Sequence, residues 1–512
     1  MTNKKRLSIN MFLSLMMFVI NLGISFFLTP YVTENVGVEA YGFISLANNF
    51  VNYASLLTIA LNSMAGRYIT IYIHQDNIEE ANKYFTSIFA ANAFLSLILL
   101  IPSIICVIFL DKFISIPTFI TNDVKILFLL VFINFFIGIM NSVFSVSTYA
   151  ANRLDISSLR NLESNIIRVV FLILFFSFLG TSVSFIGVAT CISSLYVLIF
   201  NIIYTKKLLP NIKIKKIYYD FKKVVQIIAS GIWNTITKLG QILSDGLDLL
   251  LSNIFIDSVA MGQLAVAKTL STIVNNLICT VTAVFQPQLT IHYAKNNISA
   301  FVKEMIFSMK LTTFFSNIVI CGLIAFGYQF INLWLPNQNV LLIYHLTVIT
   351  IAGGIVSAAI NSLFDTFTIT NKLKVNSIVT ICLGFLNVLL LFFVLKFTNL
   401  GIYAIAGISI LVGTIKNLTF TPIYASKCLN ISKKTFYPTI FKCLFSSVLL
   451  IVCFTFIGSI FKITNWLYLI AICGISGVIG LIINFIVLFN KTERDQFIIM
   501  IKSKIFKKKV VV

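Results

Sequence analysis

The sequence predicts an all-α, polytopic membrane protein of about 14 transmembrane helices, with two pseudo-symmetric six-helix lobes and two extra C-terminal helices. Three observations lead to this fold class: an apolar composition, hydrophobic spans along the whole chain, and a second half that repeats the first. Hydrophobic residues make up 58% of the 512 residues and charged residues only 11%. Water-soluble domains of this length do not have such a composition.

The predicted spans are stretches of about 20 apolar residues, the length that crosses a bilayer as a helix. They lie near residues 9–29, 42–63, 84–110, 125–149, 163–180, 183–204, 224–255, 259–284, 306–332, 341–369, 375–396, 399–423, 436–460 and 465–490. The first span is too long for a signal-peptide core and lacks a small-residue cleavage site. We therefore expect it to be an uncleaved membrane helix.

The repeat appears when residues 38–85 are placed on residues 258–305 at a constant offset of 220. Nine of the 48 positions are then identical, among them Gly42/Gly262, Asn77/Asn297 and Lys83/Lys303. A second stretch, which begins with Asn141/Asn361, keeps the same offset. Chance explains poorly why one offset holds over two separate segments, and repeated halves of this kind are typical of transporters.

Basic residues in the connections predict the orientation, because Lys and Arg collect on the cytoplasmic side of a membrane protein. With the N-terminus inside, the alternate loops and both tails hold 28 Lys and Arg residues, against four in the opposite loops. Both termini are therefore expected to be cytoplasmic, in the cytoplasmic (inner) membrane of a bacterium. The net charge of +21 is spread over these segments, so attraction to membrane lipids explains it without nucleic acid as a partner.

Four segments follow from the spans. Residues 1–205 form the predicted N-terminal lobe with spans 1 to 6, and residues 206–223 a basic cytoplasmic linker with seven lysines. Residues 224–425 form the C-terminal lobe with spans 7 to 12. Residues 426–512 hold the extra helix pair, which shapes a lipid-facing groove or braces the second lobe, and a basic cytoplasmic tail.

Polar residues at helical spacing mark four of the spans. In span 7, Asn234, Lys238, Gln241, Asp245, Asp248 and Ser252 follow one another three or four residues apart, which places them on one helical face. Span 8 repeats the pattern with Lys268, Thr272 and Asn275, span 2 carries Asn48 and Asn52, and span 1 carries Asn10, Ser14, Asn21 and Ser25. Such faces line a polar cavity or hold helices together, and the charges in spans 7 and 8 favour the cavity.

The charges within spans suggest two tasks. Lys238, Lys268 and Lys416 are candidates for binding an anion, with Arg67 at the cytoplasmic end of span 2 as a further candidate or a simple positive-inside anchor. Asp245, Asp248 and Asp365 are candidates for carrying or balancing a coupling cation, and the sequence does not choose between proton and sodium. Placing a charge at mid-bilayer costs on the order of 3 kcal/mol even on lenient scales, so a function is the default reading.

Several chemistries are disfavoured. Nine cysteines stand singly, almost all inside spans, and three histidines are scattered, so we expect reduced thiols and no metal site. The sequence has no glycine-rich phosphate loop, nucleophile elbow or HExxH motif. We therefore expect neither enzymatic activity nor a bound cofactor.

Loose motifs point to a family. They are Phe-Leu-Thr-Pro-Tyr at residues 27–31, Gly-Val-Glu-Ala-Tyr-Gly at residues 37–42, and Arg67-Tyr68 at the end of span 2. With the span plan, they make nearly the whole chain resemble the oligosaccharide (O-antigen and capsule, Wzx-type) flippases of the multidrug/oligosaccharidyl-lipid/polysaccharide (MOP) transporter superfamily. The resemblance implies transfer of an undecaprenyl-pyrophosphate-linked oligosaccharide to the outer leaflet, for O-antigen or another surface polysaccharide. A polysaccharide polymerase is then a candidate partner.

The residues agree with that task, and three alternatives stay open. Sugar hydroxyls need Asn, Ser and Thr partners and a pyrophosphate needs cations, which the predicted cavity would provide. A cation-coupled multidrug exporter of the same superfamily would favour acids and aromatics over lysines. A lipid II flippase would differ in being indispensable for growth. A membrane scaffold without transport would leave the polar stripes packed and dry.

Overall fold

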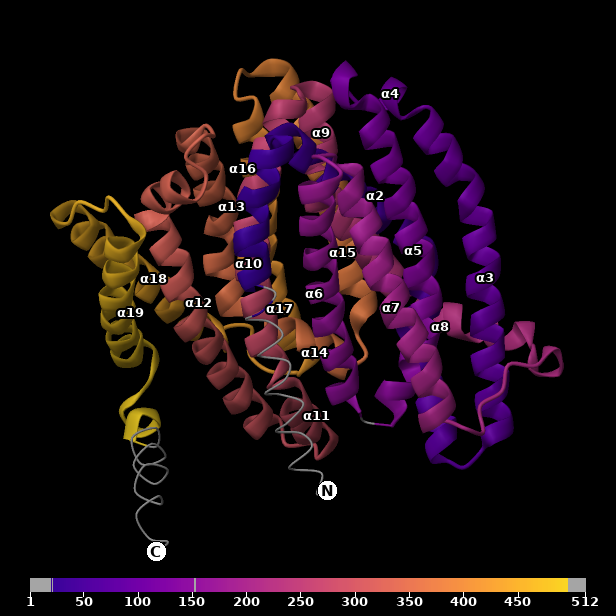
Figure 1. Ribbon diagram of the computed structural model, residues 1–512. Helices are drawn as coiled ribbons and strands as arrows, with labels where there is room; N and C mark the ends of the chain where they lie inside the picture. The colour runs from indigo at the N-terminus through magenta and orange to yellow at the C-terminus, as the bar shows by residue number, and fades with distance from the viewer. Residues whose placement is uncertain (1–19, 21, 152, 496–512) are drawn as a thin grey trace, which may run out of the picture. The chain divides into compact units, whose positions relative to one another are not determined.

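The computed structural model describes residues 20, 22–151 and 153–495, which are helical almost throughout (Figure 1). Two short 3-10 turns, η1 (Thr118–Ile120) and η2 (Lys216–Tyr218), and one π-helical segment, η3 (Ile242–Gly246), interrupt the α-helices. The α-helices are α2 (Val38–His74), α3 (Ile78–Ile108), α4 (Leu110–Phe113), α5 (Thr121–Ala150), α6 (Leu154–Phe178), α7 (Ser184–Leu208), α8 (Phe221–Gln241), α9 (Asp248–Phe255), α10 (Ser258–Ala283), α11 (Gln286–Ala294), α12 (Ile298–Trp334), α13 (Val340–Ile360), α14 (Leu363–Ile369), α15 (Leu373–Phe397), α16 (Ile402–Leu418), α17 (Phe420–Cys428), α18 (Tyr437–Ile460) and α19 (Trp466–Leu488).

The described residues contain 12 helices long and apolar enough to cross a membrane, so the predicted number of 14 is not confirmed. Each of the 12 falls on a predicted span. Most of the predicted span at residues 9–29 lies outside the described residues. The predicted span at residues 224–255 is not one helix, because η3 divides it into α8 and α9. A sequence criterion of length and hydropathy does not foresee that division.

The chain packs into two compact units. One comprises Met1–Val266 and Ser377–Ile405, and the other comprises Ala267–Asn376 and Ala406–Val512. In the first unit α5 packs against α7, α2 and α3, and α8 packs against α2. This grouping differs from the predicted segments, because α8 and α15 join the helices of the first half. The division into lobes at 1–205 and 224–425 remains a prediction about the repeat and about movement.

Local structure repeats at the offset of 220. Helix α2 begins at Val38 and α10 at Ser258, and α3 and α12 begin at Ile78 and Ile298. The turns before α3 and α12 share a left-handed residue, Asp76 (φ 57°) and Asn296 (φ 53°). Each turn then ends in an asparagine that caps the next helix: Asn77 accepts a hydrogen bond from the backbone of Glu80, and Asn297 from that of Ala300. The repeat seen in the sequence therefore extends to backbone geometry.

Glycine allows two close helix crossings in the first unit. A Cβ atom at Gly231 on α8 would lie 2.0 Å from the carbonyl oxygen of Ala60 on α2. Gly42 and Gly262, which are equivalent in the repeat, lie against each other, and a Cβ atom at Gly262 would lie 2.3 Å from the carbonyl oxygen of Val38. Small residues let backbones approach in this way where lipid gives helices no hydrophobic reason to associate.

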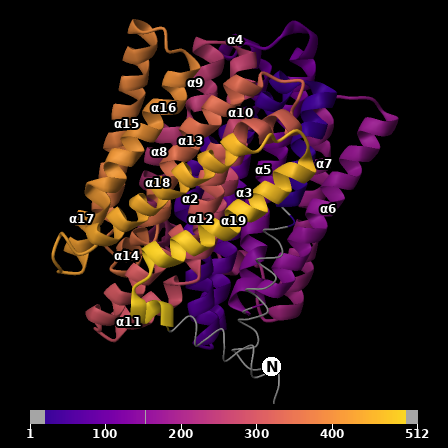
Figure 2. The ribbon, with the colours of Figure 1, turned by 90° about the vertical axis from the view of Figure 1, so that its left-hand side faces the viewer.

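In the second unit, α18 and α19 pack against α12 and against each other (Figure 2). Polar side chains join them: Asn484 of α19 donates to the carbonyl oxygen of Phe314 at 2.9 Å, and Asn317 of α12 donates to Ser447 of α18 at 2.7 Å. Beyond α19, Glu493 accepts two hydrogen bonds from the buried Nζ of Lys310, at 2.7 and 2.8 Å. The extra helix pair is thus fastened to α12 by polar contacts.

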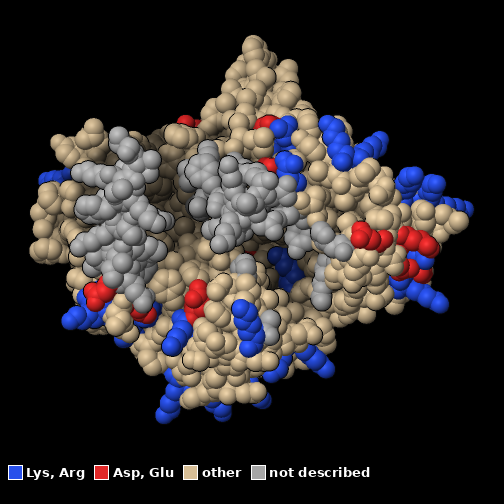
Figure 3. All heavy atoms as spheres, turned by 90° about the horizontal axis from the view of Figure 1, so that it is seen from below, with Lys and Arg blue, Asp and Glu red and all other residues tan. Residues whose placement is uncertain are grey.

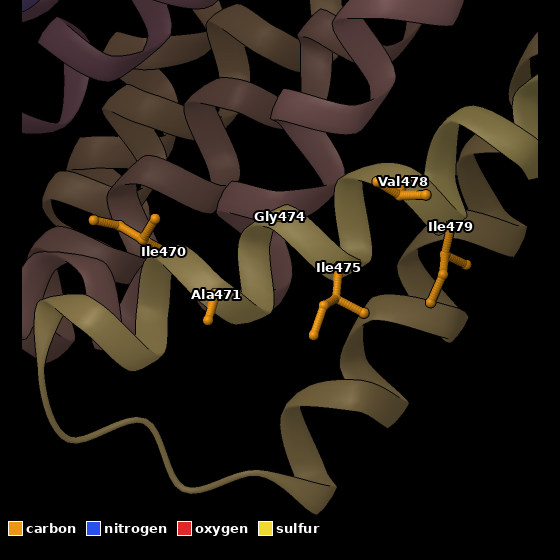
Figure 4. A pocket seen from close by; sticks show the side chains of 6 residues that line it. All are labelled: Ile470, Ala471, Gly474, Ile475, Val478 and Ile479. Carbon is orange, nitrogen blue, oxygen red and sulfur yellow. The ribbon is translucent and has the colours of Figure 1, made fainter.

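The outer side of α19 is apolar. A shallow pocket there is lined by six residues of this one helix, Ile470, Ala471, Gly474, Ile475, Val478 and Ile479 (Figure 4). None of the six offers a polar side chain to a sugar or an ion. This surface suits contact with lipid chains.

Candidate functional site

The predicted polar face of span 7 is interrupted in the middle. The π-helical segment η3 inserts between α8 and α9, so residues on its two sides do not share one 3.6-residue face. Gln241 and Asp245 are exposed, whereas Asp248 is only 2% exposed. Lys238 on α8 is half-buried. The expectation of one straight stripe from Asn234 to Ser252 is therefore wrong, because it assumed an unbroken α-helix.

Side chains of two other helices satisfy the backbone at this break. Asn387 of α15 donates from its amide to the carbonyl oxygens of Leu243 at 3.1 Å and Ser244 at 2.8 Å. Tyr53 of α2 donates to the carbonyl oxygen of Gly246 at 2.7 Å, and Asn49 donates to the same oxygen at 3.3 Å. A break at membrane depth is stable only where protein groups replace the missing helical hydrogen bonds. We call these residues, Asn49, Tyr53 and Asn387 around η3, the span-7 break.

Sequence reasoning missed the three donors of the span-7 break. Asn49 stands next to the predicted Asn48, and Tyr53 next to the predicted Asn52, so the polar character of α2 was recognised but not the contact. The one local signal was the Asp-Gly pair at residues 245–246, which is typical of an interrupted helix. Asn387 lies 143 residues from Ser244, and no pattern in the sequence connects the two.

Polar side chains of α2 and α8 contact each other, and the hydroxyl groups of Tyr68 and Ser230 lie 2.8 Å apart. Asn234 on α8 donates to Ser63 on α2 at 3.3 Å. Asn48 is exposed and donates to the carbonyl oxygen of Ile44 in its own helix at 2.9 Å, and Asn52 is exposed too. Arg67 belongs to α2, but its side chain is not among the described ones. The first unit thus holds Asn48, Asn52, Asn234, Lys238, Gln241, Asp245 and Asp248.

The second unit holds the remaining candidates. On α10, Lys268, Thr272 and Asn275 follow one another at helical spacing; Thr272 and Asn275 are exposed and Lys268 is half-buried. The hydroxyl of Thr272 donates to the carbonyl oxygen of Lys268 at 2.8 Å. The amide of Asn275 can both donate and accept hydrogen bonds, so it is the side chain of the three that can adapt best to a bound partner. This face of α10 offers a cation, a hydroxyl and an amide within two turns.

A second polar group lies where α13 and α14 meet α10. Asn361 donates to Thr282 of α10 at 3.3 Å. Four residues further on, Asp365 has a buried Oδ2 with no hydrogen-bond partner among the described residues. Lys416 of α16 lies with its Nζ 5.7 Å from the centroid of the Phe364 ring. A carboxylate oxygen buried without a donor is expensive, so this position suits a proton or a bound cation.

The described residues contain no group of three or more His, Cys, Asp and Glu side chains arranged to hold a metal ion. The sequence-predicted residues divide between the two units, eight including Arg67 in the first and Lys268, Thr272, Asn275, Asp365 and Lys416 in the second. Each set offers cations and amides, and of the helices that carry them α2, α10 and α16 are long and apolar enough to cross a membrane.

The fold places the protein in a class: it is a multi-pass helical membrane protein with the architecture of MOP-superfamily transporters. An inward-facing multidrug transporter of the MATE family superposes with a TM-score of 0.63 at 14% identity, covering 83% of this chain and 97% of that one. The lipid II flippase MurJ in an inward closed conformation gives 0.63 at 15% identity, covering 92% and 98%. A MOP-superfamily transporter from Pyrococcus furiosus gives 0.63 at 14% identity, covering 83% and 95%.

Among curated sequences, the uncharacterized membrane protein EpsK of Bacillus subtilis (strain 168) is 28% identical over 467 residues. The match covers 91% of this chain and 92% of EpsK. No family model matches the chain. These likenesses show that the chain shares its fold with solved transporters.

Proposed function

We propose that this protein is a flippase that moves an undecaprenyl-pyrophosphate-linked oligosaccharide across the bacterial cytoplasmic membrane by alternating access. Its product would serve O-antigen or other surface polysaccharide synthesis, with a polysaccharide polymerase as a candidate partner and both termini in the cytoplasm. The observation that carries the proposal is the presence of Lys238, Lys268 and Lys416 among amide side chains in the helices of a transporter fold.

The chemistry of such a substrate matches these residues. A pyrophosphate needs cations, and lysine binds it as a point charge, with Arg67 as a further candidate at the end of α2. Sugar hydroxyls both donate and accept, as do the amides of Asn48, Asn52, Asn234, Gln241 and Asn275 and the hydroxyl of Thr272. The undecaprenyl chain would stay in the bilayer, where the apolar surface of α19 can meet lipid (Figure 4).

Two of the comparisons bear on whether the substrate is a lipid or a drug. MurJ covers 92% of this chain and the MATE transporter 83%. That difference is close to the combined length of α18 and α19, the extra pair that a twelve-helix exporter lacks. It supports a lipid-linked substrate, and lipid II is then the nearest alternative. Export of a cationic drug is the second candidate function, favoured by the exposed carboxylate of Asp245.

Energy for export can come from the membrane potential. Moving negative charge out of a negative-inside cell is favourable by about 2.3 kcal/mol per charge per 100 mV. The carboxylates give a second source: Asp365, with its unpartnered oxygen, Asp245 and Asp248 are the candidates for coupling to a proton or a sodium ion. Coupling of this kind predicts that Asp365→Asn changes the ion dependence of transport and leaves the protein in the membrane.

Deletion of the gene in its host tests the proposal. Surface polysaccharide and the lipid-linked intermediate of the inner leaflet are measured in the deletion strain and after return of the wild type, Lys268→Ala, Lys416→Ala or the control Lys442→Ala. Lys442 is exposed on α18, and its Nζ donates to the side-chain oxygen of Asn490 at 3.5 Å. We expect surface polymer to be lost and the intermediate to accumulate, and Lys442→Ala alone among the three variants to restore export fully.

Other outcomes would replace the proposal. Unchanged polymer with new sensitivity to cationic drugs would point to the exporter. Arrest of growth in the deletion strain would point to a lipid II flippase. Normal export by a protein that lacks both Lys268 and Lys416 would contradict an anion cavity, and dry, inaccessible cysteines at positions 268 and 275 would favour a scaffold.

A further inference from the structure

The linker between α7 and α8, residues 209–220, is fastened by its backbone to the start of α3. Asn82 of α3 donates to the carbonyl oxygen of Asn211 at 3.3 Å and accepts from the amide of Lys213 at 2.7 Å. Thr86 donates to the carbonyl oxygen of Lys213 at 3.4 Å. Ser87 accepts from the amide of Asp220 at 2.9 Å. All these contacts use the linker's main chain. Among its side chains, Ile212 packs against the apolar cluster that includes Phe85 and Ile88 of α3, whereas residues 213–217 are exposed.

The end of the linker is held by a second set of contacts. Lys223 forms an ion pair with Glu80 at 2.6 Å and lies 4.9 Å from the centroid of the Tyr84 ring. Tyr84 also donates to Gln226 of α8 at 2.8 Å. The acid of α3 that lies nearest the linker is thereby already paired. The outward charge of the linker therefore stays positive.

The outward surface of the linker mixes cations with large apolar groups. Lys213, Lys215, Lys216 and Lys222 are exposed, and none of them forms an ion pair within the part of the chain that the structure describes. Between them the apolar side chains of Ile214, Ile217, Tyr219 and Phe221 are also exposed; Ile217, in the middle of η2, is 82% exposed and Phe221 is 64% exposed. We call these eight residues the linker surface.

We propose that the linker surface binds the anionic headgroups of the membrane leaflet beside it, with its lysines on lipid phosphates and Ile217 and Phe221 inserted at the boundary of the acyl chains. Lysines that alternate with bulky apolar groups are the composition that holds a segment at an acidic membrane surface. The linker joins two helices of a membrane protein, and in Figure 1 it projects sideways past the lower part of α3. In Figure 3, Lys and Arg side chains project at the corresponding edge, beside a group of Asp and Glu side chains.

Lipid is a better occupant than water or a protein partner for these reasons. Contact with water would leave the apolar side chains of Ile217 and Phe221 exposed to solvent. The headgroup region of a membrane accommodates both these apolar side chains and the ammonium groups of the lysines. Acidic lipid supplies the negative charge that matches the lysines of the linker surface. Because the linker continues directly into α8, bound lipid would also fix the start of that helix.

A matched probe pair within the same protein tests the proposal. Phe119 in η1 is 81% exposed, also at the centre of a 3-10 turn, but no cluster of exposed lysines surrounds it. Ile217→Cys and Phe119→Cys are made in full-length protein whose nine native cysteines are replaced, and each is labelled with an environment-sensitive fluorophore. The protein is reconstituted in nanodiscs of phosphatidylcholine with or without phosphatidylglycerol, and quenching by spin-labelled lipid is measured.

We expect quenching at position 217 to rise at least about twofold with phosphatidylglycerol and to fall with high salt. Combined Lys213→Gln, Lys215→Gln and Lys216→Gln should remove that rise, and the backbone contacts of residue 213 stay intact in this variant. Position 119 should not respond to the lipid charge. Equal quenching at position 217 in both lipids, or none in either, would overturn the proposal; the second result would point to water or a protein cover.

Discussion

Helix α2 and its repeat copy, α10 with α11, show how one backbone plan carries two chemistries. Both begin 220 residues apart, and both end in the same left-handed turn and asparagine cap. Helix α2 runs unbroken for 37 residues, whereas the copy breaks after Ala283 and resumes with Pro287 in its first turn. Proline removes a helical hydrogen bond and clashes with the preceding turn. The residue equivalent to Pro287 in α2 is Arg67.

The chemistry of the two copies differs at the faces predicted to meet substrate. Where α2 has Asn48, Asn52 and Ser55, α10 has Lys268, Thr272 and Asn275. The next helix of each copy shows the same kind of difference. Ala90 of α3 corresponds to Lys310 of α12, which binds Glu493 beyond the extra helix pair. The frame of turns and caps is thus shared, and at these two pairs of positions, 48/268 and 90/310, only the second copy carries a cation.

We expect the largest effect on stability at Lys310, a cation that the first copy lacks. Glu493→Gln removes the charge from the side chain that pairs with Lys310, which is only 5% exposed. A buried cation left without its counterion costs about 3 kcal/mol. We expect a clear fall in the midpoint of thermal unfolding in detergent. The control, Glu79→Gln, breaks an exposed pair with Lys83 and should change stability by less than about 1 kcal/mol; equal effects would show that the Lys310 pair is not structural.

The glycine contact between the two copies comes next. Gly262→Ala places a Cβ atom 2.3 Å from a backbone oxygen, and Gly42→Ala places one 2.8 Å from a backbone carbon. We expect both to destabilise by about 1–3 kcal/mol through overpacking, with Gly262→Ala the more severe. Gly474→Ala, which meets nothing within 4 Å, is the control. A larger loss of thermal stability in Gly42→Ala than in Gly262→Ala would contradict the described contact.

Exchanging the chemistry of equivalent positions tests the functional difference. Lys268→Asn gives α10 the residue of α2, and we expect it to lower export about tenfold, the loss of one charge-assisted hydrogen bond. Asn48→Lys should not restore export, because the cation would then stand on α2. Surface polymer in the complemented deletion strain is the readout. Restored export in the variant that combines Lys268→Asn with Asn48→Lys would show that only the number of cations matters.

The smallest effect concerns what the copies share. Asn77→Ala and Asn297→Ala each remove one helix cap, and each should cost about 1 kcal/mol. Amide hydrogen exchange at the first turns of α3 and α12 measures the fraying directly. We expect amide exchange to accelerate to a similar extent in the two helices. If the first turn of either helix stays protected in its variant, the asparagine does not cap that helix.

How far the sequence predicted these features depends on the range of the interaction. Composition predicted the helical membrane fold. The offset of 220 paired Asn77 with Asn297, but it did not predict the left-handed turns and helix caps found at these positions. The span-7 break was missed, since a period of 3.6 residues assumes an unbroken helix and the donor Asn387 comes from a distant segment. The partner of Lys310 was missed for the same reason, since Glu493 lies 183 residues away.

The most direct measurement of the central claim is transfer of a lipid-linked oligosaccharide across vesicles that contain the purified protein. The host's own lipid-linked oligosaccharide is placed in the leaflet equivalent to the cytoplasmic one, and its appearance on the other side is followed with and without a membrane potential. We predict that wild-type protein and Lys442→Ala transfer the lipid and that the combined variant Lys268→Ala, Lys416→Ala does not. Equal transfer by the combined variant, or none by the wild type, would contradict the account.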